Sequence, residues 1–185
     1  AYGALQVLNS LHWRIRAGER WWLSGANGAG KSTLINLIAG HLPVQQGGLL
    51  FCGRDMTRVS ATERSRRGLA RSFQLPQLFA SMTVAEHWRA VGISRQNDVR
   101  KPDELSYAER KRLDVELTLA RPAQLFLLDE PTAGLSHDEA RDFYQSLVLR
   151  FPATAMLIIE HEPLRLEGIA THAARLIHAS LETVG

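Results

Sequence analysis

The sequence has little of what secreted, membrane-spanning or metal-binding proteins depend on. Its 185 residues include one cysteine, Cys52, which excludes an internal disulfide and fits a reducing compartment. No apolar run approaches the roughly 20 residues needed to span a bilayer. Residues 1–3 carry neither a basic region nor an apolar one, so no signal peptide is expected. The seven histidines show no metal-ligand spacing.

The sequence also lacks a strong excess of charge. Its net charge of +3 is mild, whereas a nucleic-acid-binding domain usually carries more positive charge clustered on one face. Nucleic acid is therefore not expected as a partner. The composition, 45% apolar and 22% charged, is ordinary for a globular protein. The length is sufficient for one compact domain with a hydrophobic core.

The chain alternates strand patterns with helix patterns, and this predicts the α/β fold class with right-handed crossovers. The runs at 125–128 and 154–159 are apolar without alternation, which predicts strands buried on both faces of a parallel sheet. Ser106 and Ser136 are each followed three residues later by a glutamate, so both predict a capped helix start. We expect strands over 5–16, 20–23, 49–52, 125–128 and 154–159, and helices over 31–40, 55–70, 106–120 and 136–150.

The clearest motif is the sequence Gly-Ala-Asn-Gly-Ala-Gly-Lys-Ser over residues 25–32, which fits the phosphate-binding pattern G-x-x-x-x-G-K-[ST]. Its glycines let the backbone wrap around phosphates, and the following helix adds the positive end of its dipole. We expect Lys31 to contact the β- and γ-phosphates of a nucleotide and the Ser32 hydroxyl to ligate Mg²⁺. The alternative is a glycine-rich turn without a ligand, but the position between an apolar strand and a helix favours the phosphate loop.

A second motif closes the apolar strand at 125–128 with Asp129 and Glu130. An acid at the carboxyl end of a central strand faces the ligand crevice of such a sheet. We expect Asp129 to hold the hydration shell of Mg²⁺ and Glu130 to act as the general base on the attacking water. The alternative is a buried strand that ends in acids at an exposed turn.

With these motifs the chain resembles the ATP-binding cassette (ABC) ATPases over essentially its whole length. Residues 71–74 are similar to the segment that ends in the Q-loop glutamine, here Gln74. Residues 105–109 occupy the place of the L-S-G-G-Q signature, and 133–136 that of the D-loop. Residues 158–161 are similar to the H-loop, whose switch histidine is here His161. Tyr2 lies at the usual distance of the A-loop aromatic that stacks on adenine.

The resemblance implies the residues of one ATP site. The catalytic set is Lys31, Gln74, Glu130 and His161, and the Mg²⁺ set is Ser32, Gln74 and Asp129. The nucleotide-binding set is Tyr2, Gly25, Asn27, Gly28, Ala29, Gly30, Lys31, Ser32, Thr33 and Ser106. Alone, His161 would be interpreted as a structural histidine at a strand end, and only its place in this pattern favours a functional role.

The resemblance also implies the organisation of the domain. We expect residues 1–185 to form a single ABC ATPase domain, with a P-loop NTPase (RecA-like) core over about 1–74 and 121–185. A small antiparallel β part is expected at the N-terminus. A helical subdomain over about 75–120 is expected to be shorter than in the family.

The resemblance implies an importer ATPase on the cytoplasmic face of the inner membrane, as a peripheral subunit. Two cassettes, identical or paralogous, would close head to tail on two ATP molecules and drive permease subunits, with a periplasmic binding protein as an indirect partner. Several stretches are similar to the branched-chain amino acid and urea importer subgroup: 68–74, 78–79, 82–84, 131–135 and 160–162.

The signature departs from the family pattern, because Tyr107 and Ala108 stand where the consensus has glycines. Glycines there allow close approach of the backbone to phosphate, so we expect Tyr107 to point away. The alternative is that residues 106–109 are only a helix cap. Two other functions stay open: a nucleotide-binding regulatory module with weak hydrolysis, and an ABC ATPase outside transport, although the chain has neither long insertions nor tandem cassettes.

Overall fold

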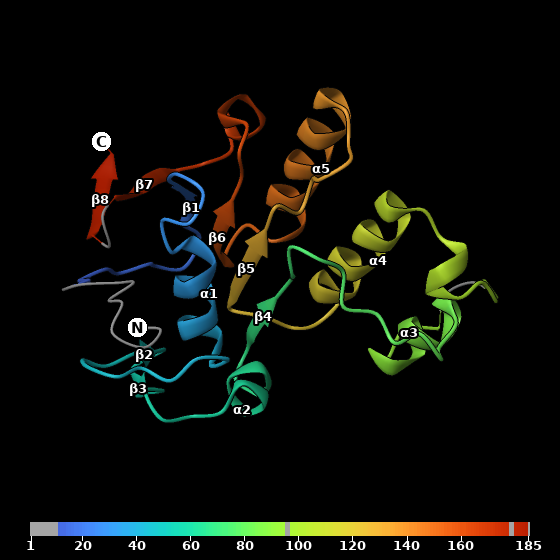
Figure 1. Ribbon diagram of the computed structural model, residues 1–185, viewed down its shortest axis with the longest axis horizontal. Coiled ribbons are helices and arrows are strands. Elements are labelled where there is room, and N and C mark those ends of the chain that lie inside the picture. The colour runs from blue at the N-terminus through green and yellow to red at the C-terminus, as the bar shows by residue number, and fades with distance from the viewer. Residues whose placement is uncertain (1–10, 95–96, 178–179, 185) are drawn as a thin grey trace.

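A computed structural model describes residues 11–94, 97–177 and 180–184. A mixed sheet runs through the molecule in the strand order β4-β5-β6-β1-β7-β8. Neighbouring strands from β4 to β7 are parallel, and β8 joins the edge antiparallel to β7. Figure 1 shows these strands, which are β1 (Arg20–Ser24), β4 (Leu69–Arg71), β5 (Leu125–Asp129), β6 (Ala155–Ile159), β7 (His172–Ile177) and β8 (Ser180–Val184).

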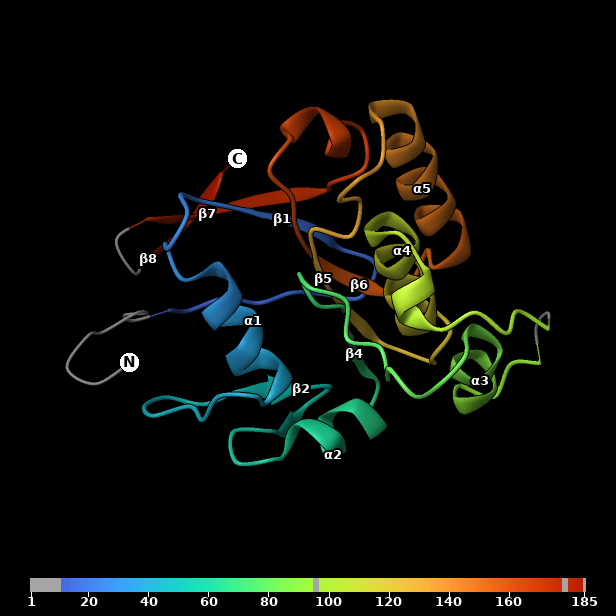
Figure 2. The same ribbon diagram turned by 45° about the vertical axis from the view of Figure 1, so that its right-hand side comes forward.

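Helices follow the strands in alternation, as expected for an α/β fold. A separate antiparallel pair, β2 (Leu50–Phe51) and β3 (Arg54–Asp55), lies beside α2 at one end of the molecule (Figure 2). The helices are α1 (Lys31–Ala39), α2 (Ala61–Arg66), α3 (Val84–Ala90), α4 (Tyr107–Leu119) and α5 (His137–Arg150), with short 3₁₀ turns η1 (Pro102–Glu104) and η2 (Pro163–Leu166). None of the helices in these described ranges is both long and apolar enough to cross a membrane.

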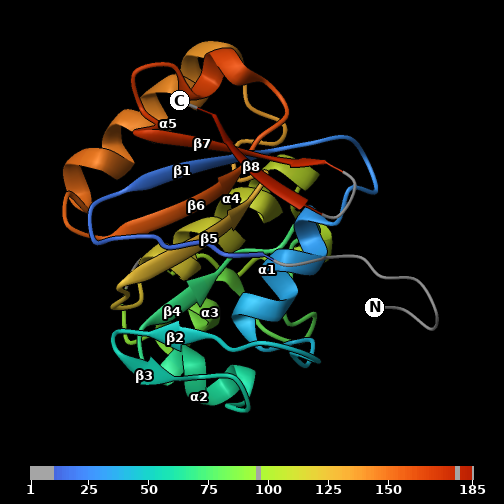
Figure 3. The same ribbon diagram turned by 90° about the vertical axis from the view of Figure 1, so that its left-hand side faces the viewer.

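The central strands separate two hydrophobic cores. On one side, Leu125 and Leu127 of β5 pack with the apolar face of α1. On the other side, Phe126 and Leu128 pack with residues of α4 and α5. Figure 3 shows the sheet between α1 in front and the other two helices behind. Every residue of β5 and of β6 is buried, which confirms the predicted strands at 125–128 and 154–159, with β6 beginning at Ala155. A strand that is buried on both faces needs apolar side chains on both, so its sequence does not alternate.

The expected helix starts at Ser106 and Ser136 are confirmed. In both, the serine side chain accepts the N–H of the glutamate three residues on, and that glutamate accepts the N–H of the serine. These reciprocal bonds satisfy backbone groups that a helix start leaves free. The α/β fold class is confirmed as well.

The expected strand over 5–16 is wrong where the structure describes it. Residues 11–16 form no ladder with another strand, although their apolar side chains still pack against the first core. Alternation therefore predicted strand pairing wrongly here, because one-sided burial alone produces the same pattern. Residues 5–10 lie outside the described residues. The strand β1 that follows pairs in parallel with β6 and β7 and is part of the main sheet.

The expected helix over 55–70 is much shorter. Asp55 ends β3 and accepts hydrogen bonds from Thr57, which turns the chain. Ser60 then caps α2 through the N–H of Glu63. Gly68 adopts a φ of +94°, which a residue with a side chain rarely takes, and the chain enters β4 at once. The arginine-rich stretch thus supplies one short helix between two strands.

Candidate functional site

The loop over 25–30 joins the carboxyl end of β1 to the start of α1. Gly25, Gly28 and Gly30 all have positive φ values, of 145°, 78° and 102°. A Cβ on Gly25 would lie 2.7 Å from the carbonyl oxygen of Leu176, so the close approach of loop and β7 excludes a side chain there. Gly30 is the N-cap of α1 and has no side chain to cap it. The first N–H groups of α1 are therefore available to an anion.

Lys31 begins α1 and turns its side chain back under the loop. Its Nζ donates to the carbonyl oxygens of Gly25 at 2.6 Å and Ala26 at 3.0 Å. Burial lowers the pKa of this ammonium, and the nearby carboxylates of Asp129 and Glu130 oppose that effect. The result is a desolvated cation held inside the curve of the loop, where it can interact strongly with phosphate.

Asp129 ends β5, and its side chain is buried. Burial raises the pKa of the Asp129 carboxyl, the neighbouring charge of Glu130 raises it further, and the cations of Lys111, Arg71 and Lys31 oppose the shift. Asp129 is thus a buried acid whose charged form a bound cation would stabilise further.

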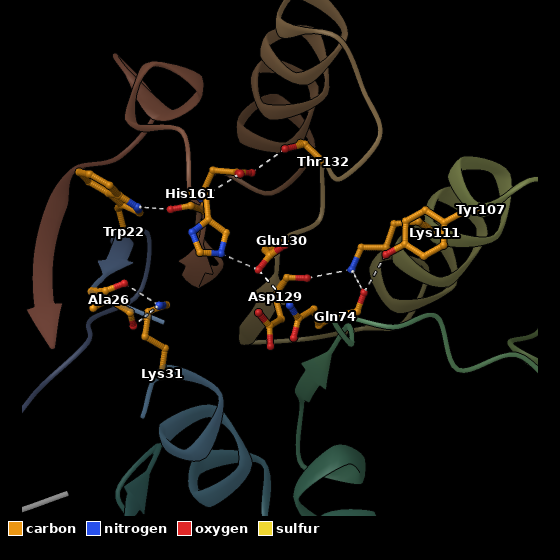
Figure 4. A network of polar contacts seen from close by, with 12 residues as sticks. Trp22, Ala26, Lys31, Gln74, Tyr107, Lys111, Asp129, Glu130, Thr132 and His161 are labelled. Atoms are coloured by element: carbon orange, nitrogen blue, oxygen red, sulfur yellow. Dashed lines mark hydrogen bonds and ion pairs between the residues drawn. The ribbon is translucent and has the colours of Figure 1, made fainter. Parts of the chain in front are cut away.

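Glu130 follows Asp129 with a left-handed backbone of φ +48°. Its Oε1 receives a hydrogen bond from Gln74 Nε2 at 3.2 Å and lies 2.9 Å from His161 Nε2. Figure 4 shows the three side chains converging from the loop after β4, the end of β5 and the end of β6. Two neighbours on one oxygen orient the carboxylate and leave Oε2 free of these contacts, as a general base requires.

These residues line one cavity of about 300 Å³ at the carboxyl ends of the strands. That position is the usual ligand crevice of an open α/β sheet. Most of the predicted site residues share the lining, which is formed by Asn27, Gly28, Gly30, Lys31, Ser32, Thr33, Gln74, Asp129, Glu130, Ile159 and His161.

Four predicted residues are not in this lining. Gly25 and Ala29 instead shape the loop, since Gly25 lies against β7 and the Ala29 N–H donates to Ala26 at 3.1 Å. Ser106 lies outside the cavity at the start of α4. Tyr2, the expected adenine platform, lies outside the described residues.

The residues present suit a Mg²⁺ ion that arrives with a nucleotide. Mg²⁺ is held by one or two carboxylates together with substrate phosphates, and seldom by a cage of protein ligands alone. In the described ranges no group of three His, Cys, Asp or Glu side chains could hold a metal. The buried Asp129 carboxylate and Ser32, which line the same cavity, match the first kind of site.

A phosphate loop facing an Asp-Glu strand end is shared by many nucleotide-binding proteins, and comparison decides the family here. The family model described as "ABC transporter" matches residues 8–133. The chain belongs to the ABC transporter family. It is an ABC ATPase domain, and ATP is the nucleotide that this family binds.

Curated relatives of this ABC domain differ in the solutes that their names give. An uncharacterized ABC transporter ATP-binding protein of Rhizobium meliloti is 32% identical, covering 97% of this chain and 74% of that protein. A probable branched-chain amino acid transport ATP-binding protein LivG of Methanocaldococcus jannaschii is 27% identical, covering 86% of this chain and 76% of that protein. An arabinose import ATP-binding protein AraG of Burkholderia pseudomallei is 30% identical, covering 86% of this chain and 37% of that protein.

The fold of the ABC domain has close structural counterparts. One is a solved ATP-binding cassette of an ABC transporter, which superposes with a TM-score of 0.83 at 25% identity and covers 98% of this chain and 85% of that one. This likeness agrees with the P-loop NTPase architecture of the chain. Among the named relatives, one is named for the transport of branched-chain amino acids and another for the import of arabinose.

The sequence prediction missed a buried lysine of this ABC domain. Lys111 on α4 is 1% exposed, and its Nζ donates to the carbonyl oxygens of Gln74 at 3.2 Å and Asp129 at 2.8 Å (Figure 4). The signal available in the sequence was its spacing of four residues from Tyr107, which places both on one helix face. A search for apolar periodicity does not detect a buried polar face of a helix.

The prediction also missed a buried acid beside His161. Glu160, at the end of β6, accepts hydrogen bonds from the hydroxyls of Thr132 at 2.5 Å and Tyr144 at 2.9 Å. Its other oxygen accepts the backbone N–H of His161 at 3.1 Å. The contact with Glu160 and burial both raise the pKa of Tyr144 well above its usual value, burial more strongly. This network links His161 to Thr132 through Glu160.

Proposed function

We propose that this ABC domain hydrolyses ATP at the cavity between the 25–30 loop and Glu130, and that the energy powers solute import through partner permease subunits. The observation that carries the proposal is the Glu130 carboxylate, oriented by Gln74 and His161 across the cavity from Lys31. A general base, a phosphate-binding cation and a loop of N–H groups on one cavity are the parts that phosphoryl transfer to water needs.

The proposed roles follow the chemistry of each side chain. Lys31 stabilises the charge of the β- and γ-phosphates, Glu130 takes a proton from the attacking water, and Gln74 with His161 orients that base. Bound Mg²⁺ would neutralise phosphate charge and would be held by Ser32, Asp129 and Gln74. The backbone of the loop, with Asn27 and Thr33, completes the nucleotide site, and stacking of Tyr2 on adenine stays a prediction.

We further propose that Ser106 serves a second ATP, bound by another cassette, because it begins a helix outside the cis cavity. Two cassettes, identical or paralogous, would close head to tail, with Ser106 of each facing the phosphates of the other. In this arrangement the division into a core over about 1–74 and 121–185 and a helical part over about 75–120 separates the cis site from the trans contact.

The permease is proposed to dock on the segment that follows Gln74. Leu75 and Phe79 are large apolar side chains of this segment and are 66% and 68% exposed. Exposed apolar side chains beside a functional loop suit a protein interface. We accordingly propose that the subunit lies on the cytoplasmic face of the inner membrane, with a periplasmic binding protein as an indirect partner. For the solute we propose branched-chain amino acids or a related small polar solute, on the likeness to LivG.

The test is the substitution Glu130→Gln, which keeps the shape of the side chain and removes its basic oxygen. ATP turnover is expected to fall by about 10²-fold or more, the contribution typical of a general base. ATP binding is expected to persist, since Lys31 and Ser32 are intact, and dimers are expected to accumulate with ATP. Turnover measurements and size-exclusion chromatography with and without ATP check both statements.

Lys31→Ala is the matched control, because it removes the phosphate-binding cation and leaves the base. It is expected to lose both ATP affinity and ATP-driven dimers. Near-normal turnover in either variant would contradict the proposed site. Normal ATP binding with negligible turnover in the unsubstituted protein would favour the regulatory module, which the altered signature supports as the second candidate.

A further inference from the structure

One face of α4 is a polar stripe that the proposed mechanism does not use. Its residues follow each other at spacings of four, three and four, which places them on one side of a helix. All but the first are buried, and every one contacts the backbone of the segment 71–77 that carries Gln74. The polar stripe consists of Tyr107, Lys111, Asp114 and Thr118.

The lower half of the polar stripe anchors both flanks of Gln74. The Asp114 carboxylate accepts the backbone N–H of Phe73 at 3.4 Å and that of Gln77 at 3.1 Å. The Thr118 hydroxyl lies 3.2 Å from the carbonyl oxygen of Arg71. Buried polar groups that satisfy backbone atoms in this way fix a segment in one conformation.

The upper half of the polar stripe converges on the backbone of Gln74 itself. Lys111 Nζ donates to the carbonyl oxygens of Phe73, Gln74 and Asp129, so one cation joins the 71–77 segment to the end of β5. The hydroxyl of Tyr107 donates to the same Gln74 oxygen at 3.3 Å. Tyr107 therefore points toward the glutamine segment of its own chain (Figure 4), which explains how a bulky residue is accommodated in the signature.

We propose that Lys111 is a positioning residue that makes Gln74 and the start of α4 move as one unit, with Tyr107 as its second anchor. The Gln74 side chain contacts Glu130 in the cis site, while Ser106 begins the same helix one residue before Tyr107. A change at the cis phosphate that displaces Gln74 then displaces Ser106 as well. This inference rests on the proposed function, since it needs Ser106 to face a second ATP.

Lys111→Met tests the link in a Glu130→Gln background, where ATP-driven dimers accumulate. Met has a similar length and cannot donate a hydrogen bond, so three carbonyl oxygens lose their cation. The ATP concentration that gives half-maximal dimerisation is expected to rise about tenfold, within the usual range for coupled sites. ATP binding to the monomer is expected to stay within about twofold, because Lys31 and Ser32 supply it.

Two further variants separate coupling from simple loss of stability. Arg112→Met makes the same exchange one residue along α4, at an exposed position, and is expected to dimerise normally. Tyr107→Phe removes only the hydroxyl from a side chain that is 43% exposed, so it keeps the test valid if Lys111→Met fails to fold. It is expected to shift dimerisation in the same direction as Lys111→Met, by a smaller factor.

A double-mutant cycle with Ser106→Ala tests whether Lys111 affects dimerisation through Ser106. If Lys111 acts through Ser106, the two substitutions together weaken dimerisation by less than the product of their separate factors. Independent factors that simply multiply, or normal dimerisation of both Lys111→Met and Tyr107→Phe, would overturn the proposal. Failure of Glu130→Gln alone to dimerise with ATP would contradict the proposed function instead, so the two failures are distinguishable.

Discussion

Glu130 shows at the scale of one residue how the site uses strain. A left-handed backbone costs a residue with a side chain on the order of 1–2 kcal/mol. Here the conformation is held by the bond from the Glu130 N–H to the carbonyl oxygen of Ile159 at 3.0 Å and by the side-chain contacts to Gln74 and His161. The left-handed residue follows directly after β5, and its side chain lines the cavity, where we propose that it acts as the base.

The buried charge of Asp129 also lowers the stability of the folded chain. Its pKa is raised in the folded chain, by burial first and by Glu130 second, above the value of about 3.9 for an unfolded aspartate. In the pH window above that value the native state binds more protons than the unfolded state. The free energy of unfolding therefore falls as pH rises through the window, and the loss is complete above the raised pKa.

Asp129→Asn is accordingly expected to stabilise the nucleotide-free protein at pH 7, because the amide carries no charge to desolvate. Its free energy of unfolding should also fall less than that of the original protein between about pH 4 and pH 7. Urea unfolding at both pH values, without Mg²⁺, measures this. Asp142→Asn, at an exposed position of α5, is the control and should change stability at pH 7 by less than about 0.5 kcal/mol. Parallel pH profiles for Asp129→Asn and the original protein would contradict the argument.

At the scale of elements, the two ends of α1 differ in how their backbone groups are satisfied. Its N-terminus has no side-chain cap, while its C-terminal carbonyl oxygens at Leu37 and Ile38 accept hydrogen bonds from Arg64 at 2.6 and 2.8 Å. Arg64 lies on α2, is 1% exposed, and also donates to the carbonyl oxygen of Val59. A buried cation at this end of α1 interacts favourably with the negative end of the helix dipole.

Arg64→Met is expected to lower the free energy of unfolding by about 2–3 kcal/mol, since several buried carbonyl oxygens lose a charged donor. The matched control is Arg66→Met on the same helix, whose side chain is 74% exposed and whose loss should cost less than about 0.5 kcal/mol. Urea unfolding of both variants measures the difference. Equal stability of the two variants would show that Arg64 does not support α1.

What could be predicted from the sequence depended on whether the signal was local. The capping boxes at Ser106 and Ser136 and the buried strands β5 and β6 were correctly predicted, because each depends on a few adjacent residues. The pairing of residues 11–16 was wrongly predicted, because a ladder needs a partner strand that alternation does not specify. The role of Lys111 depends on carbonyl oxygens of distant segments, which no sequence pattern displays.

At the scale of the whole molecule, the cis cavity holds only part of the proposed site. It contains the phosphate loop, the base and both residues that orient it, while Ser106 lies outside it at the start of α4. A site divided in this way between two chains predicts complementation: defects in different halves of the site, carried on different chains, leave one site of a mixed dimer undamaged.

Mixing Ser106→Ala chains with Lys31→Ala chains tests this prediction, with Glu130→Gln present in both so that bound ATP is not hydrolysed. If the sites are composite, each mixed dimer has one site with both defects and one site with neither. The mixture should then retain about one ATP per mixed dimer, whereas either variant alone retains little, because each of its sites lacks a phosphate contact. Retained radiolabelled ATP after rapid gel filtration measures this.

Ser60→Ala is the control for lost capping, since Ser60 caps α2 through the N–H of Glu63 in the same way. Loss of either cap should cost about 1 kcal/mol of stability, but only Ser106→Ala should weaken ATP-driven dimerisation. A mixture that retains no more ATP than the average of its two components would show that Ser106 does no more than cap its own helix.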